Sequence, residues 1–194
     1  MTLEDGRMLR ESARNMSSFI PDSKARLVDT DIEMEFLSAP EHADAITLHE
    51  YWLGKRGGRP FPDRSDISPS DFSRLLPNIL IVEVLEGGRD FRFRLYGSSM
   101  VAMTGLDRTG EYFSKLEAAP GAKISSEETR QYWMNYGAQL IGAQGPIFTR
   151  IPLVPGVGPR SMLHSVVLPL TAGGTEIGQV MAGAFIAAPE RTQA

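Results

Sequence analysis

The stretch YWLGKRGGRPFPDRSDISPSDFSRLLPNILIVEV, residues 51–84, contains a helix end, a loop, a short helix and a strand in close succession. Around its start, apolar residues spaced by three and four positions predict an amphipathic helix over Asp44–Arg56. Gly57 and Gly58 predict the end of that helix. The chain therefore reaches its first long strand from a helix, through a loop that is rich in arginine and proline.

A second, shorter helix is predicted just before that strand. Ser68 is placed as its N-cap and Pro69 as its first residue. Asp71, three positions after Ser68, is placed to accept a hydrogen bond from the N-cap amide, as in a capping box. Pro77 should end the helix at Leu76, because proline disfavours the helical conformation of the residue before it.

Apolar periodicity and the turn signals between apolar runs predict five strands. They are Asn78–Glu86, Phe91–Tyr96, Ile147–Val154, Ser161–Leu170 and Ile177–Ile186. A short helix with Met100 and Met103, and a long helix over about Ser126–Ile141 with a capping box at Ser125, lie between the second and third strands. Strands joined by short turns are antiparallel. The expected fold class is α+β, with a five-stranded antiparallel sheet and helices inserted between strands 2 and 3.

Both faces of this sheet are expected to be covered. In the last strand, the residues on the two faces are all apolar or small: Val180, Ala182, Ala184 and Ile186 on one, Ile177, Met181 and Phe185 on the other. A sheet that is wet on one side would alternate polar and apolar residues. The inserted helices can cover only one face, so the helix over 44–56 or a partner subunit should cover the other. Leu48, Tyr51 and Trp52 are the expected interface residues of that helix.

The second strand alternates in character. Phe91, Phe93 and Leu95 are predicted to face one way, and Arg92, Arg94 and Tyr96 the other. Arg150 has a similar place in the third strand. Pointing inward, Arg92, Arg94 and Arg150 would bind a carboxylate or phosphate; pointing outward, they would pair with acids of the helix over 44–56 or reach solvent.

The composition excludes several kinds of chemistry. The 194 residues include no cysteine, so a disulfide framework, a thiol nucleophile and a cysteine-ligated metal are ruled out. Three dispersed histidines, His42, His49 and His164, come without a carboxylate cluster, and no metal site is expected. No apolar run approaches the ~18–20 residues that span a bilayer. A cytoplasmic protein is therefore expected.

Charge divides the chain into two parts. Residues 1–43 carry 5 basic and 9 acidic side chains, whereas residues 44–194 carry 15 of each. A neutral body has no global field that would attract nucleic acid. The expected organisation is an acidic, partly flexible leader over 1–43, a folded domain over 44–188, and a tail over 189–194.

The order of two strands, several helices and three strands resembles that of a PAS domain. The segment FRFRLYGSSMVAMTGLDRTGEYF, residues 91–113, resembles the passage from the second PAS strand into a short helix and a glycine loop. The opening is similar to a PAS family that is common in alphaproteobacteria. Its matching positions are Trp52, Arg56, Pro60, Arg64, Asp66, Pro69, Leu76 and Pro77. The resemblance covers about residues 44–188 and implies a small sensor or regulator without a catalytic domain.

A PAS domain binds ligands between its helices and the inner face of its sheet. The candidate lining residues are Tyr96, Met100, Met103, Trp133, Tyr136, Met162, His164, Met181 and Phe185. Aromatic and methionine side chains suit an adaptable apolar cavity. The alternative is that these residues are simply the core, and that His164 is a hydrogen-bonded core histidine.

The resemblance also limits the cofactors. Cysteine-adduct flavin and thiol-linked chromophores are excluded because the sequence has no cysteine. Haem is not expected, because haem-binding PAS sensors usually place a histidine on the long helix and residues 125–141 contain none. Noncovalent flavin, a small organic acid and a fatty acyl group remain open.

The sequence thus predicts a PAS-type sensory or regulatory module and not an enzyme. It would bind a small organic ligand, a protein partner or a second copy in a homodimer, and its signal would pass through the sheet to the helix over 44–56. The enzymatic alternative is an isomerase or hydrolase on an α+β cone with Glu83 as its base. A ligand-free interaction scaffold is the third possibility.

Overall fold

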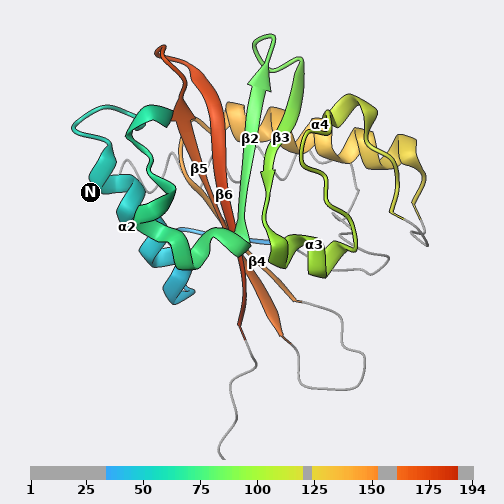
Figure 1. Cartoon of the computed structure of the whole chain (residues 1–194), viewed down its shortest axis with the longest axis horizontal. Helices are drawn as coiled ribbons and strands as arrows, with labels where there is room; N and C mark the ends of the chain where they lie inside the picture. Colours follow the sequence, from blue (N-terminus) through green and yellow to red (C-terminus); the bar gives the residue numbers. More distant parts are fainter. Residues whose placement is uncertain (1–33, 120–123, 153–160, 188–194) are drawn as a thin grey trace, which may run out of the picture.

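The structure is a computed structural model, which describes residues 34–119, 124–152 and 161–187. It has an α+β fold with one antiparallel sheet, whose strand order is β1-β4-β5-β6-β2-β3 (Figure 1). The strands are β1 (Glu35–Leu37), β2 (Ile79–Leu85), β3 (Asp90–Tyr96), β4 (Ile147–Pro152), β5 (Met162–Thr171) and β6 (Ile177–Ala187). The helices are α2 (Ala43–Lys55), α3 (Ser98–Thr104) and α4 (Ser126–Gly142), with 3-10 turns η1 (Arg64–Asp66), η2 (Pro69–Asn78) and η3 (Phe113–Lys115).

Five of these six strands are the five predicted ones, and β1 is additional. It lies within the range predicted as a leader and pairs with β4 in the register Glu35↔Arg150, Phe36↔Thr149 and Leu37↔Phe148. Three residues are too few to show an alternating pattern, so periodicity could not identify this strand. Residues 1–33, the predicted turn at 155–159 and the tail at 189–194 lie outside the described residues.

The segment before β2 differs from the prediction. It is a 3-10 helix that continues through Pro77 to Asn78, with non-helical backbone angles at Phe72. Ser68 occupies the N-cap position and Pro69 follows it, but the Ser68 side chain makes no capping bond. The Asp71 carboxylate instead accepts from Lys55 Nζ and Tyr51 Oη, each at 3.1 Å, so this acid anchors α2.

The two long helices begin with side-chain caps. Ser125 and Glu128 form the predicted capping box of α4. At α2, His42 takes the N-cap position and its Nδ1 accepts a hydrogen bond from the Asp44 amide. Gly57 and Gly58 follow α2 with positive φ angles, which confirms the predicted stop.

The two faces of the sheet are covered by different helices. Trp133 of α4 packs edge-on against Phe93 with ring centroids 5.2 Å apart, and we call this face of the sheet inner. Leu48 of α2 packs over Gly183 of β6 on the opposite, outer face. In Figure 1, α4 passes behind the strands and α2 lies at the left. The prediction that both faces are covered, one of them by the N-terminal helix, is confirmed.

Candidate functional site

The inner face carries a cluster of aromatic rings. Phe93, Phe113 and Trp133 lie in mutual contact, with ring centroids 4.7–5.3 Å apart. Tyr96 joins them edge-on at 5.2 Å from Phe93, and Tyr136 lies 6.0 Å from Trp133. The structure therefore brings together Tyr96, Trp133 and Tyr136 of the predicted lining residues.

Tyr96 reaches this cluster because of a β-bulge. The pairing of β2 and β3 shifts between Ile81↔Leu95 and Val82↔Phe93, which leaves Arg94 as the extra residue. The bulge reverses the alternation beyond Arg94, so Tyr96 shares the inner face with Phe93 while Leu95 is exposed. The predicted grouping of Leu95 with the phenylalanines and of Tyr96 with the arginines is wrong at these two positions.

Four predicted lining residues lie on the other face. Strand pairing places His164 of β5 opposite Phe185 of β6, and Met181 lies two positions from Gly183, on the α2 side. Met162 shares this face with His164 by alternation. Met162, His164, Met181 and Phe185 therefore cannot line a site beneath α4. Alternation shows which residues share a face, but not which helix covers that face.

The two methionines predicted from the short helix have different environments. Met100 is buried in α3, which packs against η2. Met103 is 38% exposed and lies at the surface. Met103 is therefore not a lining residue in this structure.

Polar groups accompany the aromatic cluster on the inner side. The hydroxyls of Thr149 and Ser165 bond to each other across β4 and β5. Burial raises the pKa of Tyr132 to about 12 and raises the pKa of Tyr136 as well. The hydroxyls of Tyr132 and Tyr136 have no hydrogen-bond partner within the residues that the structure describes. The sequence reasoning missed several members of this layer, although the apolar alternation of β3 pointed to the first two: Phe91, Phe93, Phe113, Thr149 and Ser165.

The three arginines considered as anion contacts are not brought together. Arg92 lies opposite Glu83 on the outer face and donates from Nε to that carboxylate at 2.8 Å, while Arg94 lies 3.8 Å from it. Arg150 lies on β4, which is separated from β3 by strands β5, β6 and β2. It pairs with Glu35 at 2.6 Å and with Glu41 at 2.9 Å. The acids that pair with these arginines are Glu83, Glu35 and Glu41. The outward alternative predicted acids of the helix over 44–56, and none of the three lies in α2.

The predicted interface residues of α2 face their own sheet. Leu48 and Trp52 are 0% and 1% exposed, and the Trp52 indole nitrogen donates to the Pro169 carbonyl at 2.8 Å. Tyr51 packs against Phe72 and its hydroxyl accepts from the Ser68 amide at 2.9 Å. The buried Leu48 and Trp52 therefore hold α2 to the sheet and are not available to a second subunit, and the half-buried Tyr51 ties the helix to η2.

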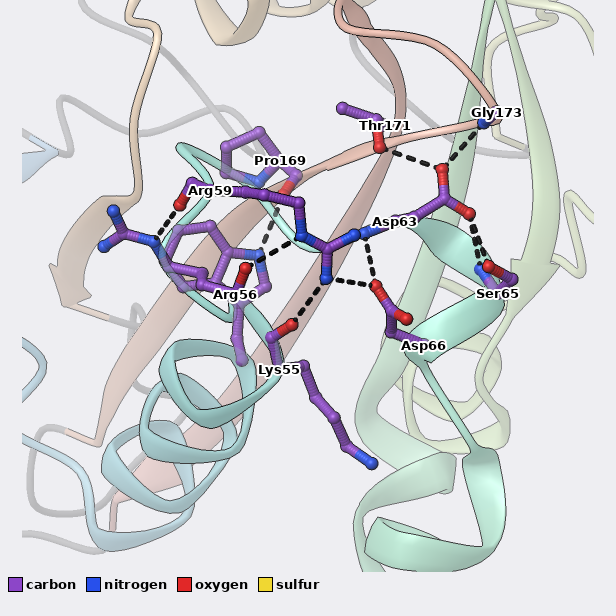
Figure 2. Close-up of polar contacts among 10 residues, drawn as sticks. Lys55, Arg56, Arg59, Asp63, Ser65, Asp66, Pro169, Thr171 and Gly173 are labelled. Atoms are coloured by element: carbon purple, nitrogen blue, oxygen red, sulfur yellow. Dashed lines mark hydrogen bonds and ion pairs between the residues drawn. The ribbon is translucent and has the colours of Figure 1, made fainter.

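The loop after α2 is a network of hydrogen bonds that joins this helix to the turn between β5 and β6. Arg59 donates to the carbonyls of Lys55 and Arg56 and to the Asp66 carboxylate, as Figure 2 shows. The Asp63 carboxylate accepts from Thr171 Oγ1 at 2.9 Å and from the Gly173 amide at 2.7 Å.

Asp63 also accepts from the amide and hydroxyl of Ser65. The Gly173 amide, followed by these other donors, lowers the pKa of Asp63 far below its ordinary value. The sequence pattern included Arg56, Arg64 and Asp66 of this loop but not Asp63, because the partners Thr171 and Gly173 are over 100 positions away. This carboxylate is an internal anchor, since its oxygens are taken up by the chain itself.

Two further findings bear on chemistry. Within the described residues, no group of three histidine, aspartate or glutamate side chains could hold a metal ion. No helix in the described part of the chain has the length and apolar character needed to cross a bilayer.

Comparison with known proteins identifies one family. Residues 40–131, from just before α2 into α4, match a family model described as a PAS domain. No curated protein matches the sequence. The three strands that follow α4 complete the antiparallel sheet expected of this fold. The chain therefore contains a PAS domain, and a PAS domain suggests a sensory or regulatory signalling module.

Proposed function

We propose that this PAS domain binds a small organic ligand between α4 and the inner face of its sheet and passes the signal to α2. The observation that carries this proposal is the structure of β6, which separates the two helices. Ala182 and Ala184 lie on the inner face of the sheet, whereas Gly183 between them lies directly under Leu48 of α2. A Cβ atom at Gly183 would come within 2.8 Å of Leu48, so α2 is in close contact with this strand. A displacement of β6 on the inner side would press on α2.

The chemistry of the inner layer favours a ligand with an aromatic or apolar body and at least one polar group. Phe93, Phe113 and Trp133 supply ring faces and edges. Tyr132 and Tyr136 of α4 supply phenol hydroxyls with no hydrogen-bond partner among the described residues, so both are available to bond a polar group of a ligand. The ligand would not be attached through a thiol, because the sequence has no cysteine.

The ligand proposal is tested by native mass spectrometry of the full chain, compared with its mass after denaturation. We expect an excess mass of one small molecule in the native state. Ala182→Leu, which adds a larger side chain on the inner face of β6, should abolish the excess. Met181→Leu, on the neighbouring residue but the outer face, should retain it. Equal native and denatured masses, or equal retention in both variants, would contradict the proposal.

We further propose that the module acts by contact with a protein, either a partner or a second copy, and resides in the cytoplasm. Ile46 and Leu53 lie seven residues apart on the solvent side of α2 and are 36% and 42% exposed. These side chains, and not the buried Leu48 and Trp52, are the part of α2 that a partner could contact.

The enzymatic alternative has less support. Glu83, its candidate base, lies on the outer face and is paired with Arg92. Its carboxylate already accepts a hydrogen bond from Arg92 Nε at 2.8 Å and is therefore not free to take up a substrate proton. It is also separated by the sheet from the aromatic layer beneath α4.

A further inference from the structure

All three histidines of the sequence lie at the interface between α2 and the outer face. His42 caps α2 and stacks on Phe185 of β6, with ring centroids 5.3 Å apart and planes 9° from parallel. The ring of His164, on β5, lies 5.8 Å from that of His42. His49 of α2 meets the Phe148 ring edge-on at 4.9 Å.

His42 performs its capping role only while its ring is neutral. Its Nδ1 accepts from the Asp44 amide at 3.1 Å, which requires a free lone pair on that nitrogen. A proton on Nδ1 would remove this acceptor. It would also place a positive charge at the N-terminus of α2, where the helix dipole disfavours cations.

His164 is in a position that resists protonation. It is 8% exposed, and its Nδ1 is buried without a hydrogen-bond partner among the described residues. Burial lowers the pKa of His164, and the neighbouring His42 and Arg150 lower it further, against an opposing effect of Glu41. Burial also lowers the pKa of His49, with Arg56 acting in the same direction and Glu50 against it.

The carboxylates near this cluster are mostly committed to other cations. Glu41 pairs with Arg150 of β4 at 2.9 Å, and Asp44 pairs with Arg74 of η2 at 2.7 Å. Two further groups on this side of α2, Asp71 and Lys55, pair with each other. Glu50 is the acid beside His49 and is exposed. An imidazolium formed at His42 or His164 would therefore have to compete for a carboxylate that another residue holds.

From this geometry we infer that protonation of the histidine cluster releases α2 from the outer face of the sheet. A lowered pKa in the docked state means that the released state binds more protons. Docking is thus fully supported above the ordinary histidine pKa of 6.5 and weakens as the pH falls below it. This control of α2 by protons does not depend on the ligand or partner proposed above.

The two tryptophans of the sequence report on the two faces separately. Trp52 lies under α2 and donates to Pro169, whereas Trp133 lies on the inner face against Phe93. Hydrogen exchange of both indole N–H groups is measured by NMR in the full chain between about pH 7.5 and 5.5, on either side of the ordinary histidine pKa. The ratio of the Trp52 rate to the Trp133 rate removes the intrinsic pH dependence of exchange. We expect this ratio to rise as the pH falls, by about tenfold per pH unit for each histidine that is excluded from protonation in the docked state.

A variant with His42→Asn, His49→Gln and His164→Leu should lose this pH dependence, and asparagine retains a capping oxygen. His49→Gln alone should reduce the slope, because the pKa of His49 is lowered in the docked state, and this preserves the test if the triple variant does not fold. A constant ratio in the natural chain, a parallel rise of both rates through global unfolding, or an unchanged slope in the foldable variants would overturn the inference.

Discussion

Trp52 connects the helix α2 to the sheet through three kinds of contact. Its ring is buried, its indole nitrogen bonds to the Pro169 carbonyl, and the Arg56 guanidinium lies 5.4 Å from its ring centroid. Trp52 and Arg56 are one helical turn apart, so their side chains can meet on the same side of the helix. The residue's role is to fix the position of α2, not to contact another subunit.

We expect Trp52→Ala to lower the free energy of unfolding by about 3 kcal/mol, because it removes a large buried ring. Trp52→Phe should cost about 1–3 kcal/mol, because the Pro169 carbonyl loses its donor while most of the ring volume remains. Urea denaturation measures both. The neighbouring exposed Leu53→Ala is the control and should change stability by less than about 0.5 kcal/mol. Similar losses at Trp52 and Leu53 would show that Trp52 does not anchor the helix.

At the scale of the elements, the strands and the two long helices could be predicted because their apolar spacing is regular over many residues. What could not be predicted depends on distant pairing. The bulge at Arg94 arises where β2 pairs with β3, and it alone decides that Tyr96 turns inward. Strand β1 depends on its pairing with the edge of β4 and on the ion pair between Glu35 and Arg150. The division of the candidate lining residues over two faces depends on which helix covers each face.

The outward side of α2 gives a prediction for assembly. If a second copy is the partner, light scattering should give twice the chain mass, and Leu53→Glu should return it to the monomer, since a charge would be buried in the contact. Glu50→Ala, also at an exposed position of α2, is the matched control and should leave the mass unchanged. A monomer at all concentrations would exclude the homodimer, and a dimer that survives Leu53→Glu would place the contact elsewhere.

For the whole molecule, the sheet separates an aromatic layer under α4 from a histidine-containing layer under α2. Strand β6 presents small residues to both sides at one point, with Ala182 and Ala184 inward and Gly183 outward. The sequence showed that this strand is apolar on both faces. Which of its residues lies under which helix could be seen only from the positions of both helices. The central claim is that the state of the inner layer changes the docking of α2.

Hydrogen exchange of the full chain, followed by mass spectrometry, tests that claim directly. The chain as isolated is compared with the same chain after unfolding in denaturant, removal of small molecules and refolding. We predict faster exchange in the refolded chain at both α4 and α2, with β1 unchanged, because loss of a ligand would loosen the inner layer and, through β6, the helix on the other face. Identical exchange of α2 in the two preparations would contradict the account.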